Sequence, residues 1–380
     1  MEEPKTVRIL HAADIHLDSP FSRLSPEGGA ARRRELREAF ARLTALLRDG
    51  DVDVALLAGD LFDREFVTPA TVELLVREFA ACPHCRVVIS PGNHDPYLPG
   101  GLYASGKLPA NVYVFRDEAL SSFAFPEIGV VVHGFAFHGD RHEAAPLAGA
   151  RAEADGALHL LCLHGDVGAP LSKYAPISEG DLASFGAAYA ALGHRHVTGA
   201  PKEVGTCRYA YAGCLVGRSF DEPGKGGAWL LSATRGEDGA WRLSPSEKVT
   251  LADRQYATLP VDLTGAEQAG EAEERVRAAV AASGYGQDTC LRVVAEGAVA
   301  PGLSLLSLPD AAALGLFSVE YSDRTTPTYG AAFLEKDLSV RGELYRALLP
   351  ALTSGTAEER AVAARALRMG LSALAGGDVE

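Results

Sequence analysis

The feature that most constrains the fold is a set of five short apolar runs, each ending in side chains that can bind a metal. In chain order they read VRILHAAD, DVALLAGD, RVVISPGN, ALHLLCLH and AYAALGH. Short apolar runs separated by amphipathic stretches predict buried strands alternating with helices, the pattern of an α/β domain. Because parallel strands deliver their carboxyl ends to one edge of a sheet, the polar side chains that follow them are expected to meet there.

The stretches between these runs predict helices. Apolar residues recur at helical spacing from Arg32 to Arg48, and Thr68 followed by Pro69 is a typical helix start. Ser178, with an acidic residue three positions later, predicts a further capped helix. Aromatic and β-branched segments elsewhere predict additional strands, so the sheet arrangement is expected to be mixed.

The character of the chain changes after about residue 250. One strand-like run, an acidic helical stretch from Ala266 to Ala282 and a second strand-like run predict a small α+β unit. From Glu335 onward the chain is rich in Ala, Leu, Arg and Glu, which predicts helices. The predicted organisation is an α/β domain over residues 1–250, a smaller α+β cap domain over residues 251–334 and a C-terminal helical segment over residues 335–380.

The charge of the chain limits the partners that it can bind. It has 50 acidic and 36 basic side chains and a formal net charge of −14, which argues against binding nucleic acid mainly through a basic surface. An anionic substrate therefore requires local positive charge, for which bound metal is a candidate source. No apolar run is long enough to predict a membrane helix, and the start MEEPKTVRIL does not read as a secretory signal. We expect a cytoplasmic protein without membrane contact.

The prediction of a metal site rests on the five run ends taken together. Singly, an Asp-x-His pair is more often a loop cap, and a histidine after a strand is more often structural. In combination and in this order they would rarely arise by chance. Carboxylate, amide and imidazole donors without thiolate suit manganese, iron or zinc. The five elements are Asp14-Ile15-His16, Gly59-Asp60-Leu61-Phe62-Asp63, Gly92-Asn93-His94-Asp95, His164-Gly165 and Gly193-His194-Arg195-His196.

These motifs resemble the calcineurin-like metallophosphoesterase superfamily over about residues 7–230. Within the superfamily, the strings HAADIHLDSPF, GDLFD and GCLVGRSFDEPGKGG look most like the bacterial SbcD and YhaO group of DNA repair exonucleases. The resemblance implies an α/β fold, a four-layer αββα sandwich of two mixed sheets flanked by helices. It also implies two divalent metal ions, with Mn²⁺ expected and Fe or Zn as alternatives.

The resemblance implies a metal role for each matching side chain. It assigns Asp60 as the bridge between the two metals, because that residue belongs to both ligand sets. Two close divalent cations clamp the oxygens of an in-line displacement at phosphorus. The first metal would be bound by Asp14, His16, Asp60 and His196, and the second by Asp60, Asn93, His164 and His194.

Four further residues are candidates for the chemistry beside the metals. His94 is not assigned to a metal, and the resemblance implies that it donates a proton to the leaving oxygen while Asp63 orients it by a hydrogen bond. Arg64 and Arg218 are candidates for contact with the substrate phosphate. For each arginine the alternative is an ordinary loop residue.

The leading interpretation is a metal-dependent phosphodiesterase that hydrolyses DNA as a 3′-to-5′ exonuclease. The family resemblance supplies the choice of DNA, and the segment after residue 250 is expected to shape the substrate groove. The motifs alone indicate only phosphoester hydrolysis. A small-molecule phosphodiesterase or phosphatase of the same superfamily is therefore an alternative, and so is a non-catalytic scaffold with a degenerate metal site.

The resemblance also implies an SMC-like ATPase partner and a possible homodimer. In the C-terminal segment, Leu344, Leu348 and Leu352 repeat every four residues and predict an apolar helical stripe. This stripe predicts either a docking surface for a partner or a helix that packs on its own domain.

Overall fold

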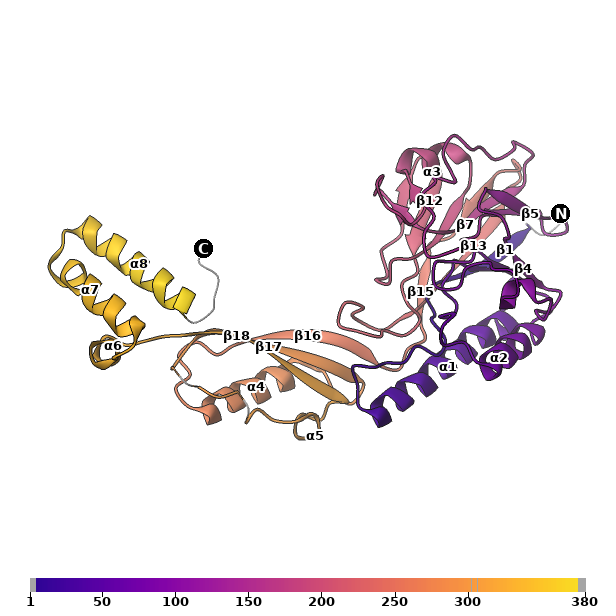
Figure 1. Ribbon diagram of the computed structural model, residues 1–380. Coiled ribbons are helices and arrows are strands. Elements are labelled where there is room, and N and C mark those ends of the chain that lie inside the picture. Colours follow the sequence, from indigo (N-terminus) through magenta and orange to yellow (C-terminus); the bar gives the residue numbers. More distant parts are fainter. Residues whose placement is uncertain (1–4, 302, 306, 375–380) are drawn as a thin grey trace. The chain divides into compact units, whose positions relative to one another are not determined.

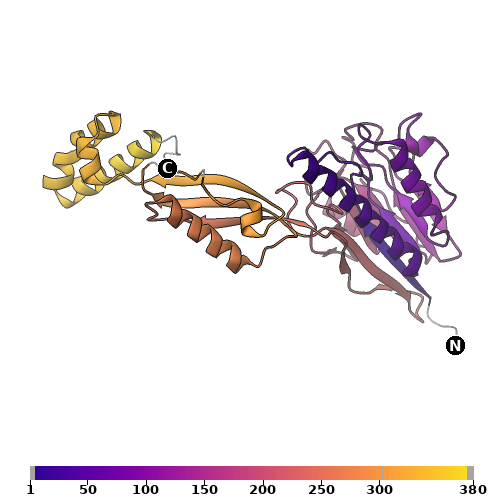
Figure 2. The ribbon, with the colours of Figure 1, turned by 90° about the horizontal axis from the view of Figure 1, so that it is seen from below.

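The chain forms two compact units, Met1–Tyr256 and Ala257–Glu380 (Figures 1 and 2). The predicted further division at residue 334 stays a prediction. In the described part of the chain, no helix combines the length and apolar character needed to cross a bilayer. The computed structural model describes residues 5–301, 303–305 and 307–374, so residues 1–4, 302, 306 and 375–380 of the predicted domains lie outside the described residues.

The five apolar runs form strands, and these strands belong to two different sheets. Within each sheet the neighbouring runs pair in parallel, so their carboxyl ends reach the same edge. The first three runs are β1 (Thr6–Ala12), β2 (Val54–Leu57) and β3 (Arg86–Ile89), and the last two are β7 (Leu158–His164) and β10 (Tyr189–Gly193).

Both sheets are mixed. The first has the order β14-β13-β1-β2-β3-β4, with β15 also pairing with β13, and the second has the order β11-β12-β10-β7-β6-β5. Strand β13 runs antiparallel to β1, and β5 runs antiparallel to β6. The other strands of this unit are β4 (Val112–Val114), β5 (Ser121–Phe125), β6 (Val130–Gly134), β8 (Asp166–Val167), β9 (Pro176–Ile177), β11 (Lys202–Val204), β12 (Cys207–Tyr211), β13 (Gly227–Arg235), β14 (Trp241–Leu243) and β15 (Glu247–Thr250).

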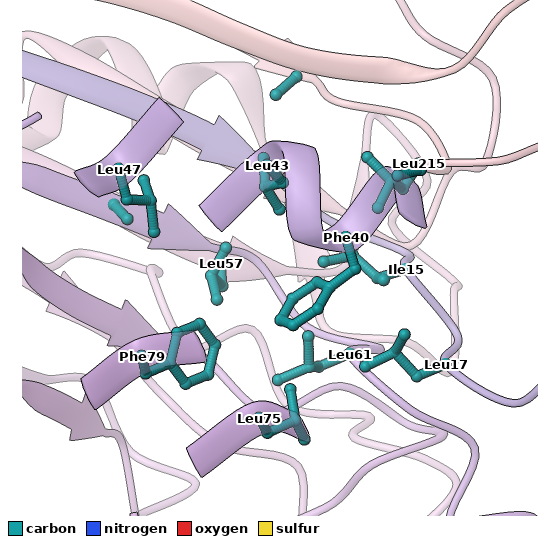
Figure 3. Close-up of a cluster of buried hydrophobic side chains, with 14 of the residues drawn as sticks. Ile15, Leu17, Phe40, Leu43, Leu47, Leu57, Leu61, Leu75, Phe79 and Leu215 are labelled. Atoms are coloured by element: carbon teal, nitrogen blue, oxygen red, sulfur yellow. The ribbon is translucent and has the colours of Figure 1, made fainter. Parts of the chain in front are cut away.

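Helices α1 (Pro26–Asp49) and α2 (Pro69–Ala80) cover one face of the first sheet (Figure 3). Phe40 of α1 and Phe79 of α2 pack with Leu57 of β2 in this core. Both helices begin at a proline that follows a hydroxyl side chain, Ser25 or Thr68, which caps the free backbone N–H groups. A short 3₁₀ helix covers Leu102–Ala104.

The first sheet is buried on both faces because its side chains alternate along each strand. Leu10 of β1 faces the helices, whereas Ile9 faces a core shared with the second sheet. The second sheet packs its other face against α3 (Glu179–Phe185), whose Leu182 lies in a third core. The first unit is thus an α/β structure with two mixed sheets and flanking helices, as predicted.

The second unit contains a three-stranded sheet in the order β16-β17-β18 and five helices among its described residues. Helix α4 lies along this sheet (Figure 2), and its Val276 and Val280 pack with Leu291 and Val293 of β17 in one core. Strand β18 pairs in parallel with β17, but its side chains are half-buried or exposed, so no apolar run predicted it. The elements are β16 (Gln255–Asp262), α4 (Ala269–Ser283), β17 (Thr289–Val299), α5 (Ala311–Leu314), β18 (Ser318–Pro327), α6 (Ala331–Lys336), α7 (Val340–Ser354) and α8 (Ala357–Leu374).

Candidate metal centre

The loops that follow the strands meet because the edges of the two sheets approach closely. Gly193 ends β10, and a Cβ atom at this position would lie 1.9 Å from the carbonyl oxygen of Ala58 after β2. Glycine permits this approach. The next residue, His194, donates its backbone N–H to the carboxylate of Asp14 at 2.9 Å, and Asp14 donates its own backbone N–H to Gly59 at 3.0 Å. The ends of β1, β2 and β10 are therefore joined directly.

Four of the predicted ligands have an unusual backbone conformation. The φ angle is 49° at Asp14, 48° at His16, 54° at Asp60 and 94° at His194. Non-glycine residues rarely adopt positive φ, and each such residue costs about 1–3 kcal/mol. Strain of this kind persists where the surrounding hydrogen bonds hold it, and it concentrates at functional sites. Four of the eight described non-glycine residues with positive φ are thus ligand candidates that the sequence identified.

The structure brings together the four side chains predicted for the first metal. One ligand atom from each of them lies within 4.8 Å of the others. Nε2 of His16 is 3.7 Å from Oδ2 of Asp60 and 3.3 Å from Nε2 of His196. Two carboxylates and two imidazoles form a mixed oxygen and nitrogen donor set that suits a divalent transition metal. The group consists of Asp14, His16, Asp60 and His196.

Asp60 also faces the side chains predicted for the second metal. Nε2 of His164 is 3.5 Å from Oδ2 of Asp60 and 3.0 Å from Oδ1 of Asn93. The His164 ring lies 5.2 Å from the His194 ring. The buried Oδ2 atom of Asp60 has no hydrogen-bond partner among the described residues, although buried carboxylate oxygens are normally satisfied. An orphaned oxygen between two donor groups fits a carboxylate that bridges two cations.

Asp166 adds a contact to the second group that the sequence did not predict. Its Oδ2 atom lies 3.6 Å from Nε2 of His194, and its other oxygen accepts a hydrogen bond from Arg195 at 3.1 Å. Asp166 therefore contacts His194 and Arg195, two neighbouring residues of the loop after β10. It lies two residues after the predicted ligand His164, at the start of β8.

Asp63 holds two histidines with the same oxygen. Oδ1 of Asp63 accepts a hydrogen bond from Nδ1 of His94 at 3.0 Å and another from Nδ1 of His16 at 2.7 Å. The hydrogen bond with Asp63 raises the pKa of His94 above its usual value, which favours the protonated form that a proton donor needs. The sequence predicted the His94–Asp63 pair. It did not predict that Asp63 also orients the neighbouring metal-ligand candidate His16.

Glu222 is the clearest residue that sequence reasoning missed. It is 6% exposed, and its Oε1 atom accepts a hydrogen bond from Nδ1 of His196 at 2.6 Å. A histidine that binds metal through one nitrogen commonly donates its other N–H to a carboxylate. Glu222 thus turns Nε2 of His196 toward the cluster. It lies within the string GCLVGRSFDEPGKGG, so its position beside the motifs was the available signal.

The two predicted phosphate-contacting arginines have partners within the protein. Arg64 pairs with Asp140 at 2.9 Å, and Arg218 pairs with Glu222 at 3.0 Å. Both arginines also line a cavity of about 410 Å³ whose wall includes His94. Their guanidinium groups are therefore held near the cluster, and their proposed contact with a substrate phosphate stays a prediction.

Asp95, the last residue of its motif, shapes the loops rather than the cluster itself. Its buried carboxylate accepts backbone N–H groups from Asp60 at 3.0 Å, Leu61 at 2.7 Å and Gly92 at 2.7 Å. The hydroxyl of Tyr103 donates a fourth hydrogen bond at 2.6 Å. Asp95 thereby ties the loop after β2 to the loop after β3, which sets the position of the bridging candidate Asp60.

Comparison with known proteins agrees with this geometry. Residues 7–197, half of the chain, match the family model described as calcineurin-like phosphoesterase. The Bacillus subtilis metallophosphoesterase YhaO is 31% identical over 242 residues, which is 60% of this chain and 58% of that protein. The match therefore spans less than two thirds of that relative.

Two shorter matches carry nuclease or repair names. One component of the SbcCD nuclease of Rhodobacter capsulatus is 35% identical over 94 residues, which is 24% of this chain and 22% of that protein. The DNA double-strand break repair protein Mre11 of Methanopyrus kandleri is 30% identical over 91 residues, which is 23% of this chain and 19% of that protein. On the match to the family model, and with a candidate dimetal site at its strand ends, the chain belongs to the calcineurin-like phosphoesterase family.

Proposed function

We propose that this protein is a dimetal phosphodiesterase that hydrolyses DNA, acting as a 3′-to-5′ exonuclease in DNA repair. The observation that carries the phosphodiesterase chemistry is the buried cluster around the orphaned Asp60 oxygen, with the His94–Asp63 pair beside it. The choice of DNA is supported by the names of the two shorter matches, one a nuclease and one a DNA repair protein. The DNA-directed activity rests on resemblance, so it is the part to be tested.

The residues of the site would divide the chemistry between them. Two divalent cations, when bound, supply Lewis acidity toward the phosphoryl oxygens and lower the pKa of water. One cation would be held by Asp14, His16, Asp60 and His196, and the other by Asp60, Asn93, His164 and His194. Oxygen and nitrogen donors without thiolate suit manganese, iron or zinc, and from the family resemblance we expect Mn²⁺, with Fe or Zn as alternatives.

His94 would provide the proton for the leaving group. Its side chain is 48% exposed and reaches the cavity, whereas its partner Asp63 is buried at the base. The imidazolium would give its proton from Nε2 to the leaving oxygen, because Nδ1 is engaged with Asp63. Arg218 lines the same cavity and would contact a nonbridging phosphate oxygen.

The second unit is proposed to extend the substrate surface and to bind partners. The predicted stripe of α7 is half-buried, and Leu344 lies against Gly370 of α8, so much of it packs within its own unit. Other large apolar side chains are exposed nearby, namely Phe333, Leu338, Val340 and Val362. We propose these as contacts for an SMC-like ATPase or for a second copy of the chain. Where such side chains form a contiguous patch, the patch often marks an interaction site.

A digestion assay tests the proposed function. Purified protein is incubated with Mn²⁺ and DNA labelled at either end, in parallel with bis-p-nitrophenyl phosphate and a phosphate monoester. We expect stepwise shortening from the 3′ end and hydrolysis of the diester. Diester hydrolysis without degradation of DNA would instead identify a small-molecule phosphodiesterase, and preference for the monoester would identify a phosphatase. Bound metal with no hydrolysis of any substrate would indicate a scaffold.

A further inference from the structure

A second cavity adjoins the one at the metal centre. It has a volume of about 550 Å³ and lies against the N-terminal half of α1. Pro20 and Phe66 line both cavities, so these two residues form a shared wall. The Phe66 side chain is 43% exposed and therefore stands at the surface between the two spaces. A ligand that leaves the first cavity past Phe66 enters the second.

The second cavity is cationic, although the chain as a whole carries a charge of −14. Its lining includes Arg33, Arg34 and Arg37, and its one acidic lining residue in the described part of the chain is Asp18. Asp18 is engaged by Arg37 at 2.6 Å. The lining therefore retains about two uncompensated positive charges. Local positive charge is what an otherwise acidic protein needs in order to hold a polyanion.

The arginines keep donors available for a ligand. Arg34 is exposed, and Arg33 gives one hydrogen bond to the carbonyl of Pro20 at 3.0 Å. A guanidinium has five N–H donors, so most of those on Arg33 stay open. By contrast, the neighbouring Arg32 is 1% exposed and paired with Glu35, which makes it structural. Arg32 thus stabilises the fold, whereas Arg33 and Arg34 keep N–H donors that a ligand can reach.

The arrangement costs the helix some stability. Arg33 and Arg37 are four residues apart, and like charges at this spacing repel on a helix. Asp18 offsets only one of them. An anionic ligand bound in this cavity would therefore reduce the repulsion that remains between the arginines.

We propose that this arginine cavity binds the phosphate backbone of the DNA strand whose scissile phosphate lies at the metal centre. The inference rests on the proposed function and adds a substrate subsite to it. Arg33 and Arg34 contact successive phosphates beyond the shared wall, while Arg37 is held by Asp18. A small diester fills only the first cavity. A polynucleotide reaches both, so the arginine cavity distinguishes a polymer substrate from a small one.

The test is the salt dependence of DNA binding. A dye-labelled single-stranded oligonucleotide with phosphorothioate linkages, which slow cleavage, is titrated with the Mn²⁺-loaded full chain at several KCl concentrations. For single strands the slope of log K against log salt changes by about 0.7 per phosphate contact. We expect Arg34→Ala to reduce the slope by about 0.7, and Arg33→Ala with Arg34→Ala to reduce it by about 1.4.

The control variant is Arg48→Ala, because Arg48 lies in the last turn of the same helix, outside both cavities, and pairs with Asp49 at 2.9 Å. It should keep the slope of the unmodified protein. A dinucleotide probe, too short to reach the second cavity, should show no difference between Arg34→Ala and the unmodified chain. Metal content and thermal unfolding verify that each variant is folded and loaded.

The outcomes separate this inference from the proposed function. If the unmodified protein degrades DNA but Arg34→Ala and the double variant keep its salt slope, the arginine cavity is not a DNA subsite and the exonuclease proposal stands. If the unmodified protein binds DNA with the predicted slope changes but never cleaves it, the subsite stands and the exonuclease proposal fails. If the protein neither binds nor degrades DNA, both are wrong.

Discussion

The two units of the chain differ in where they place reactive side chains. All eleven histidines lie in Met1–Tyr256, and none lies in Ala257–Glu380. Both groups of potential metal ligands found among the described residues belong to the first unit. The same is true of every described non-glycine residue with positive φ. Among the described residues, the first unit therefore holds both the buried metal-ligand candidates and the non-glycine residues with a strained backbone.

The difference has a physical basis in the size of the cores. Burying carboxylates and imidazoles costs free energy, and so does a strained backbone. The first unit has three hydrophobic cores, two of which lie on either face of its first sheet. Among its described residues, the second unit has one hydrophobic core, around α4 and β17. A larger apolar interior can offset the cost of a buried polar cluster, which explains why the cluster is found in the larger unit.

The largest effect on catalysis is expected from Asp60→Asn. The substitution removes the negative charge that faces both ligand groups, so hydrolysis of bis-p-nitrophenyl phosphate and of DNA should fall to background. Metal content, measured by elemental analysis, should fall with it. The matched control is Asp323→Asn, the same substitution at an exposed residue of the second unit. Retained activity in Asp60→Asn would remove this residue from the bridging role.

The second largest loss of activity is expected from His94→Gln. The variant lacks the proton donor but keeps the residues assigned to the metals, so turnover should fall by about two to four orders of magnitude with metal content nearly unchanged. Turnover and bound metal are measured on the same samples. Loss of both metals in this variant would show that His94 is a ligand rather than an acid.

Glu222→Ala tests the hydrogen bond that orients His196. The affinity for Mn²⁺ should fall by about 10–100-fold, as is typical for loss of such a partner. Glu222→Gln keeps an oxygen acceptor and should recover part of the affinity. Isothermal titration calorimetry measures both, and Glu203→Ala, at an exposed glutamate of the same unit, is the control. Equal affinities in all four proteins would leave Glu222 with a purely structural role.

Truncation after residue 256 addresses the comparison between the units directly. The first unit should retain hydrolysis of bis-p-nitrophenyl phosphate, because the cluster lies within it. Cleavage of DNA should fall much further, because the truncation removes the substrate surface proposed for the second unit, although it keeps the arginines of α1. Cooperative thermal unfolding establishes that the truncated chain is folded. Equal losses on the two substrates would argue against a substrate platform in the second unit.

The last prediction concerns the stability of the first unit at acid pH, where the effect on catalysis at neutral pH is the smallest. Burial lowers the pKa of His11 to about 3 and that of His133 to about 4, whereas an unfolded histidine has a pKa of about 6.5. Below pH of about 6.5 the unfolded state binds protons that the folded state excludes. The free energy of unfolding is therefore highest above this pH and falls as the pH drops toward about 4.

Denaturant titrations of the metal-free chain measure this loss. Both tryptophans, Trp229 and Trp241, belong to the first unit, so their fluorescence reports its unfolding. The second unit has no histidine and should show no histidine-linked change over the same range. A tryptophan transition that does not move between pH of about 6.5 and 4 would contradict the prediction.

Local sequence patterns were sufficient to predict the strands and the ligand candidates. An apolar run encodes a buried strand within its own few residues, and Asp14, Asp60 and His164 stand at the ends of such runs. Parallel pairing explains why Asp14 and Asp60 reach the same edge of the first sheet, whereas His164 belongs to the second sheet. Strand β18 escaped prediction because its side chains are only partly buried and leave no apolar signal.

The tertiary structure decided what these local patterns could not record. It divided the five runs between two sheets, and it set Asp14 of the first sheet against His194 of the second, 180 residues apart. It also placed Glu222 behind His196 and set the arginines of α1 beside the metal centre. Periodicity and motif spacing describe neighbours along the chain. Which side chains meet across two packed sheets depends on how those sheets approach, and that is determined by the packing of the whole unit.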